Sequence, residues 1–208
     1  MISHALTIVM NEINGHLHDV YQSEPPQVAL GNLAEGFTIG SGSNGLNRNM
    51  LYLSMVNIKE EKTLKNLPNR FPNSTTLKVT YENPPVFLNF MILLAATHTD
   101  YANALLVLSR AIRFFQFKNV FTQDNVAPGS MTNSGPVNPL DQLESFKLIF
   151  DLYSPTLEES NHLWGTLGGK QYPFVLYIMR LLDLKFKAVH AQGGLVTEVV
   201  SNFSHKIG

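Results

Sequence analysis

The sequence predicts an α+β fold in which a mostly antiparallel or mixed central sheet is flanked by helices. Two observations carry this prediction: amphipathic helical patterns over residues 2–22 and about 100–116, and apolar or alternating segments between and after them. The elements follow in the order helix, strands, helix, strand, helix, strand, and the length of 208 residues suits one domain. We assign residues 1–187 to this domain and expect residues 188–208 to add a C-terminal strand or arm to it.

The chain begins with its clearest helical pattern. Apolar residues recur at steps of three and four, which places them on one helix face: Ile2, Leu6, Val9, Ile13, Leu17 and Val20. Pro25 and Pro26 end this helix, because proline cannot continue the backbone hydrogen-bond ladder. After it come a short strand candidate, a loop, and a strand expected to be buried on both faces, at residues 28–30, 36–45 and 48–60.

The middle of the chain predicts two further strands and a second helix. Apolar and polar residues alternate over residues 77–81, as in a half-buried strand with Leu77, Val79 and Tyr81 on its apolar side. Residues 86–96 carry so little charge that we expect a central strand. The helix over about residues 100–116 has Thr99 as its expected N-cap. Its predicted buried stripe consists of Tyr101, Ala104, Leu105, Leu108, Ile112 and Phe115.

The last third predicts a loop, two strands and a capped helix. Residues 123–139 are dense in Asn, Gly, Ser and Pro and are expected to lack regular structure. Residues 143–153 alternate again, with an apolar side made of Phe146, Leu148, Phe150 and Leu152. Thr156 and Glu159 have the spacing of a capping box, which predicts a helix that ends at Gly168–Gly169. Residues 174–186 predict another strand.

Composition narrows the function classes. The chain has no cysteine, which excludes disulfides, thiolate metal sites and cysteine nucleophiles, and its net charge of −1 argues against a nucleic-acid binder. No N-terminal targeting signal is visible, and the longest apolar run, residues 86–96, is too short to span a bilayer, so we expect the chain to fold in the cytosol without membrane contact. Charged residues make up 15% of the chain, against about 25% in typical proteins. Either neighbouring subunits cover much of the surface, or the composition reflects the source organism.

The sequence offers no motif that would name an enzyme or a cofactor. Residues 40–45 match the dinucleotide-binding pattern G-x-G-x-x-G, but a strand follows them where the mechanism requires a helix N-terminus. The seven histidines are scattered without metal-ligand spacing, and no G-x-S-x-G nucleophile elbow occurs. We therefore predict no catalytic residue, no cofactor and no metal, and expect a protein that is not an enzyme.

Contact residues are the more promising candidates. Three phenylalanines stand within residues 114–117 and cannot all face inward from one helix, so either Phe114 or Phe117 should lie outside the core stripe. Such aromatics pack under the next loop or anchor an interface. Arg180 interrupts an apolar strand, which suggests a solvent-facing edge, an ion pair or a subunit contact. Our candidate interface residues are Phe114, Phe117, Phe121, Trp164, Arg180, Gly40, Gly42 and Gly45.

Three groups of motifs, in this order and spacing, carry a resemblance to a known family. The early part has Val28-Ala29-Leu30-Gly31-Asn32 and Val56-Asn57-Ile58-Lys59-Glu60-Glu61. The central block has Asn83-Pro84-Pro85-Val86-Phe87-Leu88-Asn89, Asp100-Tyr101-Ala102, Ala104-Leu105, Leu108-Ser109, Phe114-Phe115-Gln116 and Val120-Phe121. The C-terminal block has Leu163-Trp164-Gly165-Thr166-Leu167-Gly168, then Pro173, Tyr177 and Arg180. Over roughly residues 2–185 the chain resembles the tail-terminator, or cap, proteins of extracellular contractile injection systems, the phage-tail-like particles. Longer members carry an added C-terminal region, whose functions we do not expect here.

The resemblance implies a tail-terminator-like fold and a structural role. Such a protein forms a hexameric ring on the last ring of the inner tube, away from the baseplate, where it ends tube growth and anchors the last sheath ring. Its partners would be further copies of itself, the tube protein and the sheath protein, with assembly in the cytoplasm and the finished particle released or membrane-anchored. Candidate tube-facing segments are residues 36–45, 114–121 and 123–139. Two alternatives stay open: a baseplate-proximal adaptor of the same particle, and a small-molecule-binding enzyme that uses the glycine-rich loop.

Overall fold

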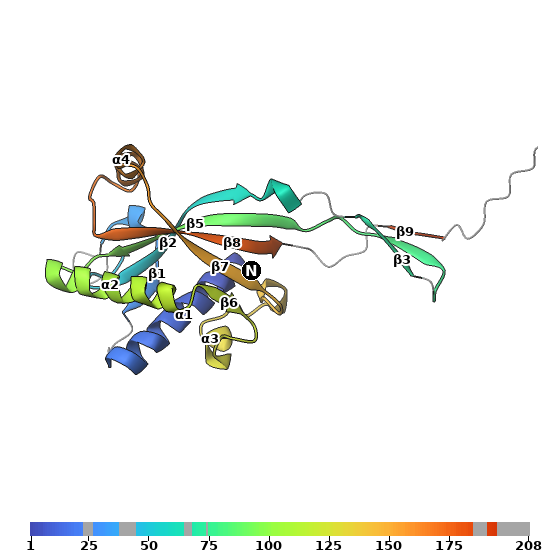
Figure 1. The fold of residues 1–208 in the computed structure, drawn as a ribbon, viewed down its shortest axis with the longest axis horizontal. Helices are drawn as coiled ribbons and strands as arrows, with labels where there is room; N and C mark the ends of the chain where they lie inside the picture. Colours follow the sequence, from blue (N-terminus) through green and yellow to red (C-terminus); the bar gives the residue numbers. More distant parts are fainter. Residues whose placement is uncertain (23–26, 38–44, 65–67, 74, 185–190, 195–208) are drawn as a thin grey trace, which may run out of the picture.

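The computed structural model describes residues 1–22, 27–37, 45–64, 68–73, 75–184 and 191–194, and its α+β fold confirms the predicted class (Figure 1). The main sheet has six strands in the order β1-β2-β5-β8-β7-β6. In that order they are β1 (Val28–Leu30), β2 (Leu51–Glu60), β5 (Val86–Ala96), β8 (Phe174–Leu184), β7 (Lys147–Tyr153) and β6 (Val120–Thr122). The β1–β2 pair is parallel and the other neighbouring pairs are antiparallel, so the sheet is mixed.

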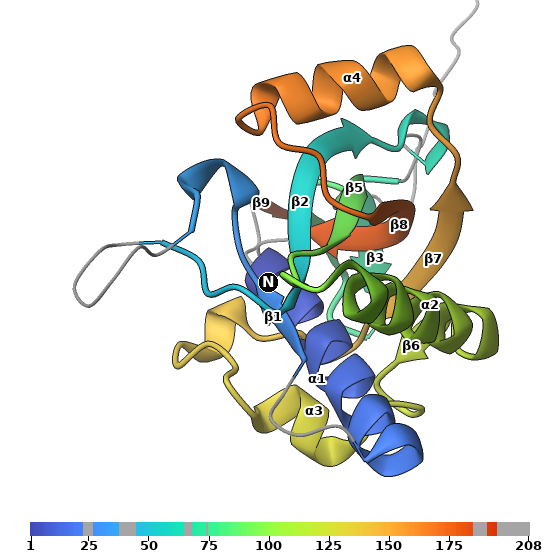
Figure 2. The same ribbon diagram turned by 90° about the vertical axis from the view of Figure 1, so that its left-hand side faces the viewer.

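Helices cover both faces of the main sheet (Figures 1 and 2). The α1 helix (Ile2–Tyr21) and the α2 helix (Tyr101–Phe117) lie on one face, and α4 (Leu157–Thr166) lies on the other. A large core between α1, α2 and the sheet includes Ile8, Ile13 and Phe90, each fully buried. A smaller core lies beneath α4 around Trp164. Within the described residues there are also three short 3₁₀ turns: η1 (Leu33–Glu35), η2 (Lys62–Leu64) and η3 (Pro139–Asp141).

A second sheet forms the end of an arm that projects from the main body (Figure 1). Its three antiparallel strands have the order β3-β4-β9 and comprise β3 (Arg70–Asn73), β4 (Lys78–Tyr81) and β9 (Ala191–Gly194). The predicted strand at residues 77–81 is present, but only Val79 is buried, whereas Leu77 and Tyr81 are exposed. The expected half-buried face is incomplete because no described helix packs on this small sheet.

Proline interrupts the outer edge of β3. The N–H of Glu82 donates to the carbonyl of Asn69 at 3.0 Å, which fixes the hydrogen-bonding phase of the β3–β4 pair. Hydrogen-bonded and non-hydrogen-bonded pairs alternate along the two strands from there. Pro72 and Val79 therefore form a non-hydrogen-bonded pair, and the backbone nitrogen of Pro72 faces the outer edge of the sheet. Proline has no N–H at that nitrogen. The outer edge of β3 therefore lacks a donor in the middle of the strand.

The α2 helix buries half of its predicted stripe, namely Ala104, Leu108 and Phe115, and exposes the other half. Its buried residues are Ala104, Val107, Leu108, Ala111, Phe114 and Phe115, while Tyr101, Leu105 and Ile112 of the predicted stripe are exposed. Ala104 and Ala111 are almost fully buried, and such small side chains let a helix approach its neighbours closely. Relative to the predicted orientation, the helix is therefore rotated about its axis so that Ala104 and Ala111 face the core. Its N-cap is Asp100, whose carboxylate accepts from the N–H of Ala102 at 3.1 Å, and not the predicted Thr99.

The α4 helix begins and ends as its sequence predicts. Thr156 and Glu159 form both hydrogen bonds of the capping box, at 3.2 and 2.8 Å. At the other end the N–H of Gly169 donates to the carbonyl of Trp164 at 2.7 Å, and Gly168 and Gly169 have φ angles of 97° and 77°. The glycines allow the chain to turn back toward β8, which keeps Trp164 over the sheet.

Two other predictions need correction in part. The strand predicted at residues 48–60 is buried only over its first half, since Leu51–Ser54 are buried and most residues from Met55 onward are exposed. Neither helix layer reaches that second half, which extends toward the arm (Figure 1). The segment predicted to lack structure, residues 123–139, contains the short helix α3 (Pro128–Thr132) and the start of η3. The β9 strand lies within residues 188–208, whose assignment as a C-terminal strand or arm of the same domain stays a prediction. Residues 185–190 and 195–208 lie outside the described part.

Candidate interaction surfaces

Two of the candidate aromatic contacts lie inside the protein. Phe114 is 2% exposed and Phe121 is fully buried, both in an aromatic cluster centred on Phe115. The Phe115 ring lies 4.5 Å from that of Tyr177 and 4.9 Å from that of Phe150, between ring centroids. Burial raises the pKa of Tyr177 to about 12. The sequence left open whether Phe114 or Phe117 lies outside the core, and the structure places Phe117 there, with 78% of its surface exposed.

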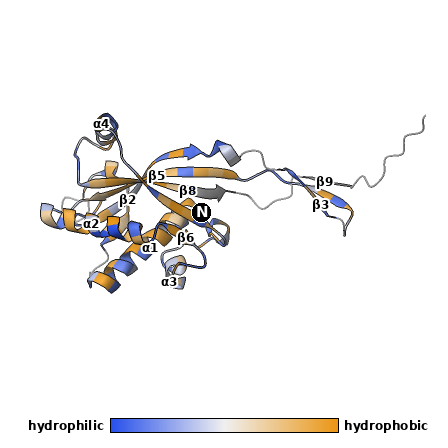
Figure 3. Cartoon of the chain, viewed as in Figure 1, coloured by the Kyte–Doolittle hydropathy of each residue, from blue (hydrophilic) through white to orange (hydrophobic). Residues whose placement is uncertain are grey.

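The outer face of α2 is apolar and basic. We use this name for the five large exposed apolar residues and the two arginines of the helix: Tyr101, Leu105, Leu106, Ile112, Phe117, Arg110 and Arg113. Figure 3 shows hydrophobic residues along α2 at the end of the molecule away from the arm. The helix contains no acidic residue. Sequence reasoning missed this surface because it placed Tyr101, Leu105 and Ile112 in the core.

A second apolar surface is the 136–141 turn. Val137 is 98% exposed and Leu140 is 73% exposed, so both side chains point away from the core. The charged residues between 133 and 146 are Asp141 and Glu144, which makes this region acidic. Sequence reasoning treated the region as loop. The available signal was a pair of bulky aliphatic residues in a segment otherwise rich in Asn, Pro, Gly and Ser.

Hydrogen bonds hold the 136–141 turn in one shape. The side chain of Asn138 accepts from the N–H of Leu140 at 3.0 Å, and the side chain of Gln142 donates to the carbonyl of Pro136 at 2.9 Å. The N–H of Asp141 donates to the carbonyl of Asn138 at 3.0 Å. Together these bonds fix the turn before any partner binds.

Buried His4 of α1 attaches this region to the body. The N–H of Leu143 donates to His4 Nδ1 at 2.8 Å, so Nδ1 carries no proton. His4 Nε2 therefore bears the hydrogen and donates it to the carbonyl of Met131, also at 2.8 Å. Asn11, further along α1, donates to the carbonyls of Ser130 and Asn133 at 3.1 and 2.9 Å. Polar side chains of α1 thus hold the segment that the sequence predicted to be unstructured.

We expect His4→Leu to lower the free energy of unfolding by about 1–3 kcal/mol, because the N–H of Leu143 and the carbonyl of Met131 lose their buried partner. Urea denaturation measures the change, and hydrogen exchange at the Leu143 amide should accelerate. The matched control is His162→Leu on the exposed surface of α4, which should change stability by less than about 0.5 kcal/mol. Equal effects of the two substitutions would contradict the structural role of His4.

Arg180 lies on the open part of the sheet face that α4 leaves uncovered. Its Nε is 2.8 Å from a carboxylate oxygen of Asp151, and both side chains are nearly half exposed. On the neighbouring strand, Asn89 donates to Glu61 at 2.9 Å. Hydrogen bonds from Thr63 and Asn89 hold the pKa of Glu61 below its usual value, and the charge of Arg180 contributes. Of the alternatives that the sequence left for Arg180, the ion pair is present, within a polar strip across the sheet.

The remaining candidates lie apart from these surfaces. Trp164 is 4% exposed and packs against Tyr172 and Phe174, with ring centroids 5.9 and 5.3 Å away. Gly40 and Gly42 lie outside the described residues, and Gly45 is half-buried at the end of that loop. Phe117 and Arg180 are thus the candidate side chains that the structure places at the surface, on different elements.

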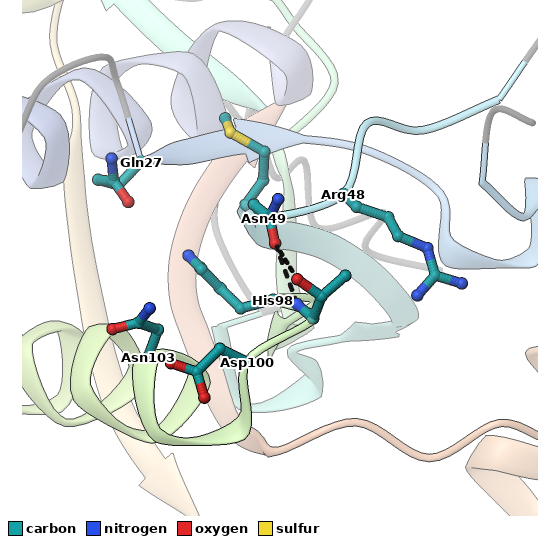
Figure 4. Close-up of a pocket in the computed structure, with 8 residues that line it drawn as sticks. Gln27, Arg48, Asn49, His98, Asp100 and Asn103 are labelled. Carbon is teal, nitrogen blue, oxygen red and sulfur yellow. Dashed lines mark hydrogen bonds between the residues drawn. The ribbon is translucent and has the colours of Figure 1, made fainter. Parts of the chain in front are cut away.

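A pocket of about 450 Å³ lies where β2 begins and α2 starts (Figure 4). Its lining residues are Gln27, Arg48, Asn49, Met50, His98, Thr99, Asp100 and Asn103. The side-chain oxygen of Asn49 accepts from the N–H and the hydroxyl of Thr99, at 3.0 and 3.1 Å, and so ties the two elements together. Most of its lining side chains are polar, and the pocket is open to solvent.

The chemistry of this pocket does not assemble a catalytic group. The hydroxyl of Thr99 donates to Asn49, and the carboxylate of Asp100 caps α2. Burial lowers the pKa of His98, against the opposing effect of the Asp100 charge, so the ring favours its neutral form. Within the described ranges no three His, Asp or Glu residues gather as a metal site would require. In that same part of the chain no helix is long and apolar enough to cross a membrane.

The mixed sheet with its extended arm, the helices on both faces and the exposed apolar side chains are typical of a protein that contacts other chains. The chain matches the Pvc16 N-terminal domain family over residues 5–198 and belongs to that family. The match confirms the resemblance seen in the sequence. No curated protein matches the chain.

One solved structure shows the same fold, and a second aligns less well. The sheath/tube terminator of PVC, an extracellular contractile injection system in its extended state, aligns with a TM-score of 0.60 and 13% identity, covering 100% of this chain and 64% of that chain. The tube-terminating cap of the anti-feeding prophage aligns with a TM-score of 0.47 and 14% identity, covering 96% of this chain and 60% of that one. The chain therefore spans less than two thirds of the length of these two structures.

Proposed function

We propose that this protein is the tube terminator of a contractile injection system, a structural cap that ends the growth of the inner tube. The observation that carries the proposal is the family match over residues 5–198, together with the fold shared with the sheath/tube terminator of PVC. The low charge content of 15% and the exposed apolar side chains of α2 add support, because both favour burial between subunits.

A cap acts through its surfaces. One surface must bind the last ring of the tube, and the opposite surface must differ from the surface on which the next tube ring would assemble. We propose that identical copies form a closed ring, a hexamer, which matches a ring-shaped tube end. In such a ring each copy contacts its two neighbours through two different surfaces. The arm and the polar strip around Arg180 are exposed and free of the ring contacts proposed below, which makes them candidates for tube and sheath contacts.

A structural cap requires no catalysis, so the proposed role does not depend on a catalytic group. The pocket at the start of α2 contains His98 and Asp100, but the hydrogen bonds of its side chains maintain the fold and do not pair a nucleophile with a base. Assembly in the cytoplasm and incorporation into a phage-tail-like particle belong to the same proposal, as does anchoring of the last sheath ring.

Particles assembled without this protein test the proposal. We expect inner tubes of irregular length, because nothing ends their elongation, and electron microscopy measures the length distribution. Adding back the intact gene should restore a narrow distribution. A baseplate-proximal adaptor would give a different result, since its loss would prevent tubes from starting. An absence of tubes, or tubes of unchanged uniform length, would overturn the cap assignment.

A further inference from the structure

We propose that the 136–141 turn of one copy docks on the outer face of α2 of the next copy, and that this contact links the subunits of the ring. The occupant of the α2 face is thus a second copy of this chain. The inference rests on the proposed function only in requiring that several copies assemble side by side. It assigns the two surfaces that meet.

The two surfaces have complementary chemistry. The outer face of α2 combines exposed apolar residues with Arg110 and Arg113, and the helix has no acidic residue. The 136–141 turn presents Val137 and Leu140, followed by Asp141, and no basic residue stands between residues 133 and 146. Apolar side chains can therefore cover one another while Asp141 meets Arg113. Opposite charges across an interface fix its register and exclude wrong partners.

Helical geometry supports the pairing of Arg113 with two apolar neighbours. Leu106, Arg113 and Phe117 are spaced by seven and four residues, which places them along one stripe of α2. Leu106 is 46% exposed and Phe117 is 78% exposed, so the arginine lies between two accessible apolar side chains. The turn presents the corresponding arrangement, with Leu140 next to Asp141.

The turn is already in its docking shape. Its backbone is held by Asn138 and Gln142, and the region behind it is attached to α1 through His4. A rigid turn loses little conformational freedom on binding, which raises affinity without further contacts.

The two surfaces lie on opposite sides of the molecule. Figure 2 shows α2 on the right and the yellow segment that follows α3 on the left. A contact between different surfaces on opposite sides is heterologous, so each copy binds one neighbour on each side, and the series closes when the rotation per copy is an integer fraction of a turn. The polar strip on the sheet face has charges of both signs within each copy and lacks this complementarity.

Cross-linking tests the contact in assembled particles. The sequence has no cysteine, so in a variant with Leu106→Cys and Leu140→Cys a short bis-maleimide reacts with this chain only at the two introduced positions. We expect a ladder of linked copies up to the full ring. The single variants should give no linked product, because each surface meets the other one and not itself. A matched control replaces Leu106→Cys by Leu157→Cys on α4, which is 79% exposed and should not link to position 140.

Charge reversal gives an independent readout. We expect Arg113→Glu and Asp141→Arg each to weaken association of the copies by about tenfold, and the combination to restore most of it. Thermal unfolding of the dissociated chain should stay unchanged, because both side chains are exposed. Equal damage from the single and double reversals would refute the pairing.

The tube-length measurement on the same particles separates this contact from the cap function. Uniform tubes from the double-cysteine variant without a ladder would overturn the contact and leave the cap function intact. A ladder in particles with irregular tubes would support the contact and count against the cap function. Linked product from either single-cysteine variant would show a different, like-to-like contact and would also overturn the proposal.

Discussion

Replacing Phe115 by alanine should lower the free energy of unfolding by about 3–5 kcal/mol, the range found for large aromatic residues in well-packed cores. Phe115 is 2% exposed and lies at the centre of the aromatic cluster, with ring contacts to Phe150 and Tyr177. The rings around it come from α2, β6, β7 and β8, so the cavity left by the substitution opens where four elements meet. These elements cannot all move inward to fill it.

The neighbouring Phe117 provides a matched control. The same change, Phe117→Ala, removes a ring from the same helix two residues further on, but this ring is 78% exposed. We expect a loss below about 0.5 kcal/mol. Urea denaturation at low protein concentration measures both variants without interference from assembly. Similar losses at the two positions would contradict the assignment of Phe115 to the core and of Phe117 to the surface.

Replacing Glu12 by alanine should cost about 3–5 kcal/mol, because the substitution leaves Lys118 poorly hydrated and without its charge partner. The Nζ of Lys118 is 2.7 Å from a carboxylate oxygen of Glu12, and the two side chains are only 19% and 9% exposed. The other carboxylate oxygen accepts from the N–H of Ala127 at 2.7 Å. Glu12 thus joins α1 to the end of α2 and to the segment before α3.

A double substitution separates the charge from the packing. In Glu12→Leu with Lys118→Met both charges are removed, and apolar groups fill the space, so we expect much of the stability to return. Urea denaturation of the single and double variants gives the coupling energy of the pair. A double variant as unstable as Glu12→Ala would show that packing, and not the lone charge of Lys118, causes the loss.

The pH dependence of the Glu12 contribution follows from its pKa. Burial alone raises the pKa of Glu12, but hydrogen bonds from Lys118, Ser130 and Ala127 together with the Lys118 charge outweigh burial and hold the pKa below its ordinary value of 4.5. The folded state therefore binds the proton less tightly than the unfolded state. The contribution of ionised Glu12 to the free energy of unfolding is complete above about pH 4.5. It is lost as the pH falls through the lower pKa that Glu12 has in the folded state. The stability difference between wild type and Glu12→Gln should narrow in that acidic range.

The sequence predicts most of the elements because their signals are local. The capping box at Thr156, the apolar periodicity of α1 and the low charge of residues 86–96 each depend on neighbours in the chain. The rotation of α2 about its axis depends instead on how closely its alanines approach α1 and the sheet. The apolar pattern of a single helix does not contain that information. Apolar residues occur all around α2, so periodicity alone cannot select the buried side.

The candidate interface shows the same limit. Nothing local in residues 123–143 reveals that His4, Asn11 and Glu12 hold them, since these partners are more than 100 residues away. The polar residues at positions 4, 11 and 12 share one side of α1 and are the signal that was available in the sequence. The aromatic candidates were misplaced for a related reason, because phenylalanines that crowd one helix also pack in a core that several strands complete.

The missing donor at Pro72 has a consequence if several copies assemble on one particle, as the proposed function requires. An exposed strand with all its N–H groups recruits strands from other molecules, and neighbouring particles would then adhere through their arms. With Pro72 facing outward on β3, such recruitment is blocked on that side of the arm. The proline thus disfavours edge-to-edge pairing of arms without changing the side chains that the arm exposes.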